Sequence, residues 1–303
     1  MKTWIKIALA LLALLLLAVG YVAYQQRFFI KMALVPLRPY VPTELPEDTT
    51  QLFVVNGEWS SHDTAYLFVQ GGPNYILYTE EFNALHYLPN SPHLLKVFPT
   101  QSQIYNHAVF AATPNLTEAQ AEAELQVSVD MLDRTIRYAK DRVKTVVAIG
   151  HSYGSHILLE YLDTRENMAD HVVLMGLNLD MDMRNIAAID KGKVITWVDG
   201  TDPQERDPFP DVLRSTSLQD KFINMATLMK HGKKRYTQAL ADDDLAAVIY
   251  VYGEKDESVG RPTERELDFL REKQVRIEAL EGGHMSMWST EFMSRLDGML
   301  REG

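Results

Sequence analysis

Residues 145–154 read TVVAIGHSYG, and residues 155–162 continue with SHILLEYL. The run at 145–149 is apolar and rich in β-branched residues, which is typical of a fully buried strand. The segment that follows predicts a helix that packs back on the same sheet. Ser152 lies between the two elements, with a glycine two residues before it and another two residues after it. The sequence therefore predicts a very tight strand–turn–helix connection.

Such a turn places the serine in dihedral angles that are strained for a residue with a side chain. Glycines at Gly150 and Gly154 let the strand and the helix approach closely. The strain holds the Ser152 hydroxyl clear of the backbone at the carboxyl edge of the sheet, which is the geometry of a nucleophile elbow. The pattern Gly-x-Ser-x-Gly is common by itself, and its strand and helix flanks make it informative here.

A serine hydroxyl needs an adjacent base, and the base needs a carboxylate to orient it. Two further apolar runs lead to such residues in a suitable order. Residues 246–252 predict a buried strand that leads into Asp256, and residues 275–280 predict a strand near the sheet edge that leads into His284. Because the carboxyl ends of parallel strands meet at one edge, we expect both side chains beside Ser152.

These three segments make the chain resemble the serine hydrolases of the α/β-hydrolase superfamily, from about residue 50 to its end. The resemblance implies an α/β fold with a mainly parallel sheet and helices on both faces. It also implies that Ser152 is the nucleophile, that His284 is the general base and then the acid, and that Asp256 orients His284.

The identity of the acid stays open among four residues. Glu254 and Glu257 are neighbours of Asp256, and Asp199 follows an apolar run of its own at 194–198. We favour Asp256, because its strand directly precedes the strand that leads to the histidine.

The sequence also offers an oxyanion hole. An apolar strand at 65–69 leads into residues 70–73, QGGP, which are similar to the His-Gly-Gly-Pro segment of the superfamily's prolyl-aminopeptidase-like branch. In that branch a glycine backbone turns an N–H toward the oxyanion. Since proline has no N–H, the expected donors are Gly72 and Tyr153, the residue after the nucleophile. Gln70 stands where that branch has histidine, which leaves the substrate analogy open.

Strands and helices alternate through most of the chain after residue 50, as in a mainly parallel sheet. Residues 117–120 read TEAQ, a capping box that predicts a helix to about residue 140. Other strands are predicted at 52–55, 93–98 and 171–175, and a short helix around 80–87.

The alternation breaks between residue 178 and about 245, where methionines and aromatic residues are interspersed with charges and prolines. Inserts at this point often form a lid in the superfamily. An apolar lid would favour a hydrophobic acyl group, while the equal alternative is that these side chains only cover the sheet.

The N-terminal segment predicts a membrane anchor. Residues 7–26 carry no charge and supply about the 20 apolar residues that a spanning helix needs. We interpret residues 1–26 as an uncleaved signal anchor, with a cleaved secretory signal as the alternative. The prolines of residues 27–49 predict an extended spacer. The domain at 50–303 is expected outside the cytoplasm, which in a bacterium is the periplasm.

Composition narrows the functional classes. The formal net charge of −11 argues against nucleic-acid binding through a basic surface. With no cysteine there is no disulfide or thiol chemistry. No phosphate-binding loop, dinucleotide motif or His-Glu-x-x-His motif stands out, so we expect neither a cofactor nor a metal.

The sequence therefore predicts a membrane-anchored serine hydrolase that cleaves carboxylic esters of a small-molecule acyl substrate. The catalytic alternatives are a prolyl-aminopeptidase-like peptidase, a thioesterase and a lysophospholipase. A peptidase of that branch would need an acidic pocket for a free amine, for which Glu80 and Glu81 are the candidates. A binding domain that keeps the fold without catalysis is the alternative from another class. The sequence leaves the oligomeric state unknown.

Overall fold

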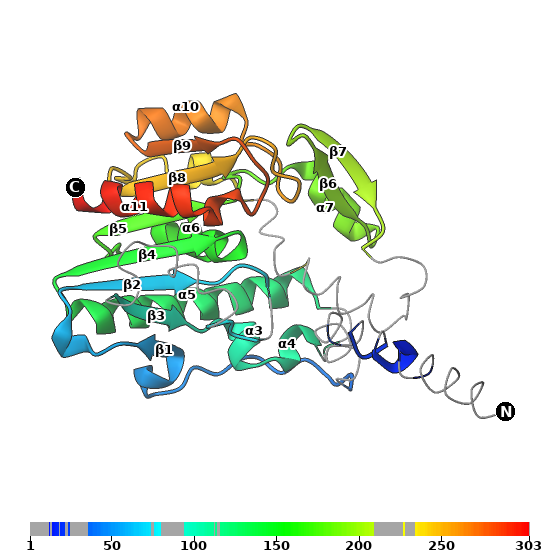
Figure 1. Cartoon of the computed structure of the whole chain (residues 1–303), viewed down its shortest axis with the longest axis horizontal. Coiled ribbons are helices and arrows are strands. Elements are labelled where there is room, and N and C mark those ends of the chain that lie inside the picture. Colours follow the sequence, from blue (N-terminus) through cyan, green and yellow to red (C-terminus); the bar gives the residue numbers. More distant parts are fainter. Residues whose placement is uncertain are drawn as a thin grey trace.

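The structure is a computed structural model of the whole chain (Figure 1). It describes residues 36–73, 76–79, 94–111, 113, 116–208, 227 and 234–302, and within the N-terminal segment residues 12, 14–17, 19–21 and 24. The helix predicted at 80–87 lies outside the described residues.

A seven-stranded sheet forms the centre of the molecule, with the strand order β1-β3-β2-β4-β5-β8-β9. Only β1 runs antiparallel to its neighbour, so the prediction of a mainly parallel sheet is confirmed. The strands span Phe53–Asn56 (β1), Thr64–Val69 (β2), Leu95–Pro99 (β3), Thr145–His151 (β4), His171–Met175 (β5), Val248–Gly253 (β8) and Arg276–Leu280 (β9).

The central strands are apolar along their whole length because both faces of the sheet are covered. Alternate residues of β4 belong to different apolar clusters: Val146 and Ala148 to one, Val147 and Ile149 to the other. The strand β9, at one end of the sheet, is buried on fewer positions, as its alternating sequence predicts.

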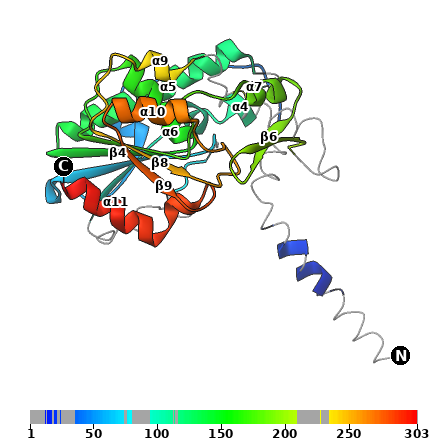
Figure 2. The same cartoon turned by 90° about the horizontal axis from the view of Figure 1, so that it is seen from above.

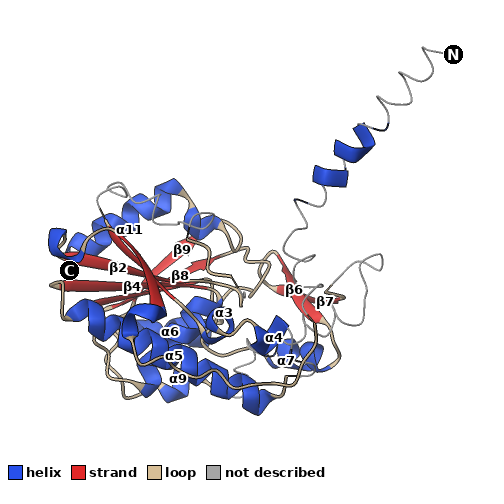
Figure 3. Ribbon diagram, turned by 90° about the horizontal axis from the view of Figure 1, so that it is seen from below, coloured by secondary structure: helices blue, strands red, loops and turns tan. Residues whose placement is uncertain are grey.

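Helices cover both faces, as Figures 2 and 3 show. The first apolar cluster contains side chains of α5 (Glu118–Lys140), α6 (Tyr153–Thr164) and α10 (Glu264–Glu272). The second contains side chains of α11 (Thr290–Glu302). The shorter helices are α3 (Ser102–Tyr105), α4 (Ala108–Ala111), α7 (Met183–Asp190) and α9 (Tyr236–Ala239).

Helix α5 begins where the capping box predicts. The Thr117 hydroxyl accepts a hydrogen bond from the N–H of Gln120 at 3.2 Å, and the Gln120 side chain accepts one from the N–H of Thr117 at 2.9 Å. Its predicted apolar side is buried in the core at Leu125, Leu132 and Ile136.

The segment between β5 and β8 departs from the sheet, as the sequence predicts. It contains α7, α9 and an antiparallel pair, β6 (Val194–Val198) and β7 (Asp202–Arg206), which form a separate two-stranded sheet. Figure 1 shows this hairpin beyond the carboxyl ends of the central strands. Residues 209–226 and 228–233 of the predicted insert lie outside the described residues.

Residues 40–49, which the sequence places in the spacer, pack on α5. Glu124 is buried and accepts hydrogen bonds from the Tyr40 hydroxyl at 2.8 Å and the Thr43 N–H at 3.0 Å. Arg134 donates to the carbonyl oxygens of Pro46 and Glu47. This part of the chain is therefore held against the domain before β1 begins.

The predicted membrane-spanning segment lies mostly outside the described residues. Among the residues that are described, no helix is both long enough and apolar enough to cross a membrane.

Candidate active site

The turn after β4 has the strained geometry that the sequence predicts. Ser152 has φ 52° and ψ −118°, a region that side-chain-bearing residues rarely adopt. Its N–H donates to the Met175 carbonyl at the end of β5, at 2.8 Å. The Ser155 hydroxyl also bonds both the N–H and the carbonyl of Met175, at 2.8 and 2.9 Å. The start of α6 is thereby fixed to the edge of the sheet.

The two elbow glycines are required by close backbone contacts. A Cβ atom on Gly150 would lie 2.7 Å from the backbone of Gly154. A Cβ atom on Gly154 would lie 2.0 Å from the carbonyl oxygen of Val69, at the end of β2. No side chain fits at either position, so β2, β4 and α6 can meet at this point only because both residues are glycine.

Asp256 and His284 lie together at the same edge, after β8 and β9. The Nδ1 atom of His284 is 2.8 Å from Oδ2 of Asp256, and Asp256 is fully buried. The other carboxylate oxygen accepts the N–H groups of Ser258 and Val259 at 2.8 and 3.0 Å. Because the carboxylate accepts, Nδ1 of His284 is the protonated nitrogen and Nε2 is left as the acceptor.

The three other candidates for the acid that orients His284 do not contact its imidazole. Glu257 accepts the backbone N–H of His284 at 3.0 Å, so it supports the loop rather than the ring. Glu254 is exposed, and Asp199 is exposed in the turn between β6 and β7, outside the central sheet. Of these four carboxylates, Asp256 is the one that bonds the imidazole.

The predicted oxyanion segment adjoins the elbow, because β2 is the neighbour of β4. A Cβ atom on Gly71 would lie 3.4 Å from Cβ of Ser152 and 3.0 Å from the carbonyl oxygen of His151. Gly72 has φ 139°, in the region that favours glycine. Tyr153, the other expected donor, is the first residue of α6. The predicted donor Gly72 therefore directly follows Gly71, which lies against Ser152, and the predicted donor Tyr153 directly follows Ser152 itself.

Gln70 stands where the prolyl-aminopeptidase-like branch has histidine, and its hydrogen bonds hold this loop. It is buried, its side-chain amide donates to the Ile76 carbonyl at 2.9 Å, and its carbonyl oxygen accepts the Tyr78 N–H at 2.7 Å. The backbone carbonyl of Gln70 in turn accepts the Gln101 side-chain amide at 2.6 Å. The glutamine thus bridges the two sides of the loop that contains Gly71 and Gly72.

The ring of His151 packs against the ring of His284. The two ring centroids are 4.6 Å apart, and Nε2 of His151 lies 3.3 Å from the His284 carbonyl oxygen. The Trp288 ring also packs on the His151 ring, with the centroids 4.9 Å apart. Burial, and secondarily the proximity of His284, lowers the pKa of His151 to about 3, so this ring is neutral at neutral pH.

Ser152 lies on the walls of two cavities. The first, of about 270 Å³, is also lined by His284 and by residues 70–72 of the oxyanion segment. Its other walls are the side chains of Phe68, Tyr78, Met285 and Trp288. The other, of about 40 Å³, lies toward α7 and is lined by Tyr153, His156, Leu177, Met181 and Val259 among others. Within the described part of the chain, no cluster of three or more His, Asp or Glu side chains could hold a metal ion.

Neither a protein-family model nor a curated protein matches this sequence. Solved structures do match. MGS-M2, an α/β-hydrolase enzyme from a Medee basin deep-sea metagenome library, has a TM-score of 0.53 at 13% identity over 83% of this chain and 94% of that chain. A hydrolase from Oleispira antarctica has 0.51 at 13%, over 88% and 99% of the two chains. A lipase-esterase related protein from Clostridium acetobutylicum has 0.50 at 14%, over 82% and 98%.

The chain has the α/β-hydrolase fold. The predicted resemblance is therefore confirmed at the level of the fold. Gln70, His151 and Glu257 have supporting roles in this site that the sequence does not predict. The place of Glu257 next to Asp256 is a usable signal, whereas the contacts of Gln70 and His151 have no signal in the local sequence.

Replacement of Gly154 by alanine tests the close contact at the elbow. We expect Gly154→Ala to lower the free energy of unfolding by about 3 kcal/mol or more, because its Cβ atom would overlap Val69. Gly298→Ala is the matched control, since a Cβ atom there meets nothing within 4 Å, and in helix α11 it should raise stability by up to about 1 kcal/mol. Urea unfolding measures both, and equal effects would contradict the contact.

The buried His151 predicts a pH dependence of stability. Its pKa lies below the ordinary value of 6.5, so between 6.5 and about 3 the unfolded chain binds more protons at this residue than the folded one. Stability is therefore lost as the pH falls, and from pH 7 to pH 5 this residue accounts for about 2 kcal/mol. Urea unfolding at both pH values should show a smaller loss for His151→Gln than for the wild type. Identical losses would show that His151 is not buried in its neutral form.

Proposed function

We propose that the protein is a serine hydrolase that cleaves carboxylic esters through an acyl-enzyme. The observation that supports this most directly is the 2.8 Å contact of Asp256 with His284, at the sheet edge where Ser152 is held in a strained turn. A serine, a histidine and a buried carboxylate in this arrangement are the parts of a catalytic triad.

Each part has one task in the proposed mechanism. The Ser152 oxygen attacks the acyl carbon while Nε2 of His284 takes its proton, and Asp256 stabilises the imidazolium that forms. The N–H groups of Gly72 and Tyr153 stabilise the negative charge on the carbonyl oxygen. His284 then gives the proton to the leaving alcohol. In the second half-reaction His284 takes a proton from water while the water oxygen attacks the acyl carbon. His284 then gives this proton to the Ser152 oxygen as the acid is released.

None of the described residues that line the larger cavity beside Ser152 is acidic: they are aromatic, apolar or neutral polar side chains, glycines and histidines. This lining suits the uncharged alcohol part of an ester. The smaller cavity on the other side of Ser152 is lined by one acid, Asp182, which Arg184 bonds on both oxygens. Glu80 and Glu81, the acids that the sequence suggests for a peptidase, lie outside the described residues. A similarly folded protein is itself described as lipase-esterase related, which agrees with this choice.

The proposal includes the N-terminal anchor. The uncharged residues 7–26 would hold the catalytic domain at a membrane, on its extracytoplasmic side, and the insert between β5 and β8 would serve as a lid. Alkaline carbonate washing of cell membranes should leave the full chain in the pellet, and a variant that lacks residues 1–26 in the wash. Recovery of the full chain in the wash would contradict the anchor.

Labelling with a fluorophosphonate probe tests the nucleophile. We expect the wild type to be labelled and Ser152→Ala not to be, because the probe bonds covalently to an activated serine. His284→Ala and Asp256→Asn should lower the rate of ester hydrolysis by about 10³–10⁴. Ser61→Ala, at an exposed serine, is the control and should be labelled as the wild type is. Labelling that persists in Ser152→Ala, or a folded wild type without labelling, would contradict the proposal.

A further inference from the structure

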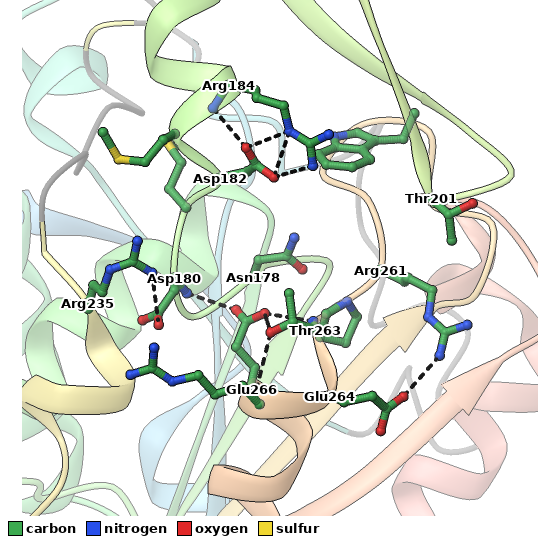
Figure 4. Close-up of a pocket in the computed structure, with 16 residues that line it drawn as sticks. Asn178, Asp180, Asp182, Arg184, Thr201, Arg235, Arg261, Thr263, Glu264 and Glu266 are labelled. Carbon is green, nitrogen blue, oxygen red and sulfur yellow. Dashed lines mark hydrogen bonds and ion pairs between the residues drawn. The ribbon is translucent and has the colours of Figure 1, made fainter.

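A cavity of about 680 Å³ lies near the site, beyond the carboxyl ends of the central strands (Figure 4). Its walls come from the loop after β5, from α7, from the turn between β6 and β7, and from the start of α10. Asn178, Met181 and Asp182 line both this cavity and the 40 Å³ space beside Ser152. We refer to the small space, which is lined by Ser152 and adjoins the large cavity, as the neck.

Three of the four acidic side chains that line the large cavity hold its walls through hydrogen bonds, and the fourth, Glu264, is exposed. Glu266 is buried, and its two oxygens accept the N–H groups of Asp180 and Thr263 at 2.8 and 2.7 Å. Asp180 accepts the N–H and the hydroxyl of Thr237 at 3.2 and 2.8 Å. Asp182 is bonded on both oxygens by Arg184. Little acceptor capacity is left on these three groups.

Three exposed arginines of the same cavity have N–H donors that no described residue accepts. Arg235 comes no closer than 3.4 Å to Asp180, and Arg261 no closer than 3.5 Å to Glu264. Arg265 makes no hydrogen bond or ion pair with any described residue. Each guanidinium has five N–H donors in a planar fork that fits a carboxylate. Figure 4 shows Arg235 and Arg261 on opposite sides of the cavity, with Asn178 between them.

A buried donor in the wall adds an independent sign of a missing acceptor. Trp197 is only 7% exposed, and its indole N–H has no hydrogen-bond partner among the described residues. Buried polar groups are nearly always hydrogen-bonded in folded proteins, so this N–H needs an acceptor, and the Oδ1 atom of Asn178 in the same wall, which also has no partner among the described residues, needs a donor. An anionic group in this cavity would supply an acceptor for arginine donors on its wall.

We infer that this cavity binds an anionic group at the far end of the substrate's acyl chain, an inference that rests on the proposed ester hydrolysis. His284 must reach the leaving alcohol to protonate it, and His284 lines the 270 Å³ cavity on one side of Ser152. The acyl chain then runs to the other side, through the neck, where Leu177, Met181 and Val259 offer an apolar wall. The preferred substrates are monoesters of dicarboxylic acids.

Paired substrates test this inference. The first is a mono-p-nitrophenyl ester of a linear dicarboxylic acid, and the second is the same ester with its far carboxylate replaced by a primary amide, each over a range of chain lengths. We expect kcat/KM to favour the carboxylate by at least about tenfold at the best length, since arginine–carboxylate hydrogen bonds are charge-assisted. Arg235→Gln and Arg261→Gln should each lower this ratio several-fold.

Arg206→Gln is the matched control, because Arg206 is exposed on β7 and does not line the cavity. It removes the same charge and should leave the ratio unchanged. Calorimetric titration of Ser152→Ala with the free dicarboxylate gives a readout without turnover, and binding should weaken when Arg261→Gln is added.

The outcomes separate the two proposals. Hydrolysis of both esters without preference, or a preference that the arginine variants and the control reduce equally, overturns the anionic subsite and leaves the serine hydrolase intact. A dicarboxylate that does not bind to Ser152→Ala also overturns the subsite. Absence of both turnover and fluorophosphonate labelling overturns the proposed function, and the acyl assignment of the cavity with it.

Discussion

Strand β4 must turn into α6 within one residue, directly against the end of β2. The contact between Gly154 and the Val69 carbonyl leaves no room for a side chain, and it fixes how deeply the helix sits on the sheet. The strain at Ser152 follows from this contact, because the backbone has no wider path between the two elements. The position of the serine is therefore set by backbone packing, and the residues around it are arranged to meet it.

The register of the parallel strands brings those residues to one edge. Val69 pairs with Gly150, His151 with Met175, and Gly253 with Leu280, so the loops after five strands begin at nearly the same level. Asp256 and His284 need only short loops to reach each other from there. Hydrogen bonds from Ser258 and Val259 then orient the carboxylate, while Glu257 and His151 support the loop and the ring of His284.

The sequence predicts the sheet well because its central strands are buried on both faces, and such strands are continuous apolar runs. The elbow and the partners of Ser152 are predictable for a similar reason, since glycine spacing and strand ends are local features. The hairpin of β6 and β7 is less evident: its second strand reads DPQER, and its signal is the Asp199-Gly200 turn, where both residues have positive φ. The bonds of Tyr40 and Thr43 to Glu124, and those of Gln70 within its loop, join side chains to backbone or to distant residues. Neither the composition nor the periodicity of the sequence predicts these hydrogen bonds.

The strand order has a consequence for how the site comes apart. Strand β4, which leads to the proposed nucleophile, is hydrogen-bonded on both sides, whereas β9, which leads to the proposed base, ends the sheet in the described structure. Edge elements open at lower free energy than central ones. On gentle warming the histidine loop should therefore detach while the elbow is still formed, so that inactivation is an early and local event and melting of the sheet a later one.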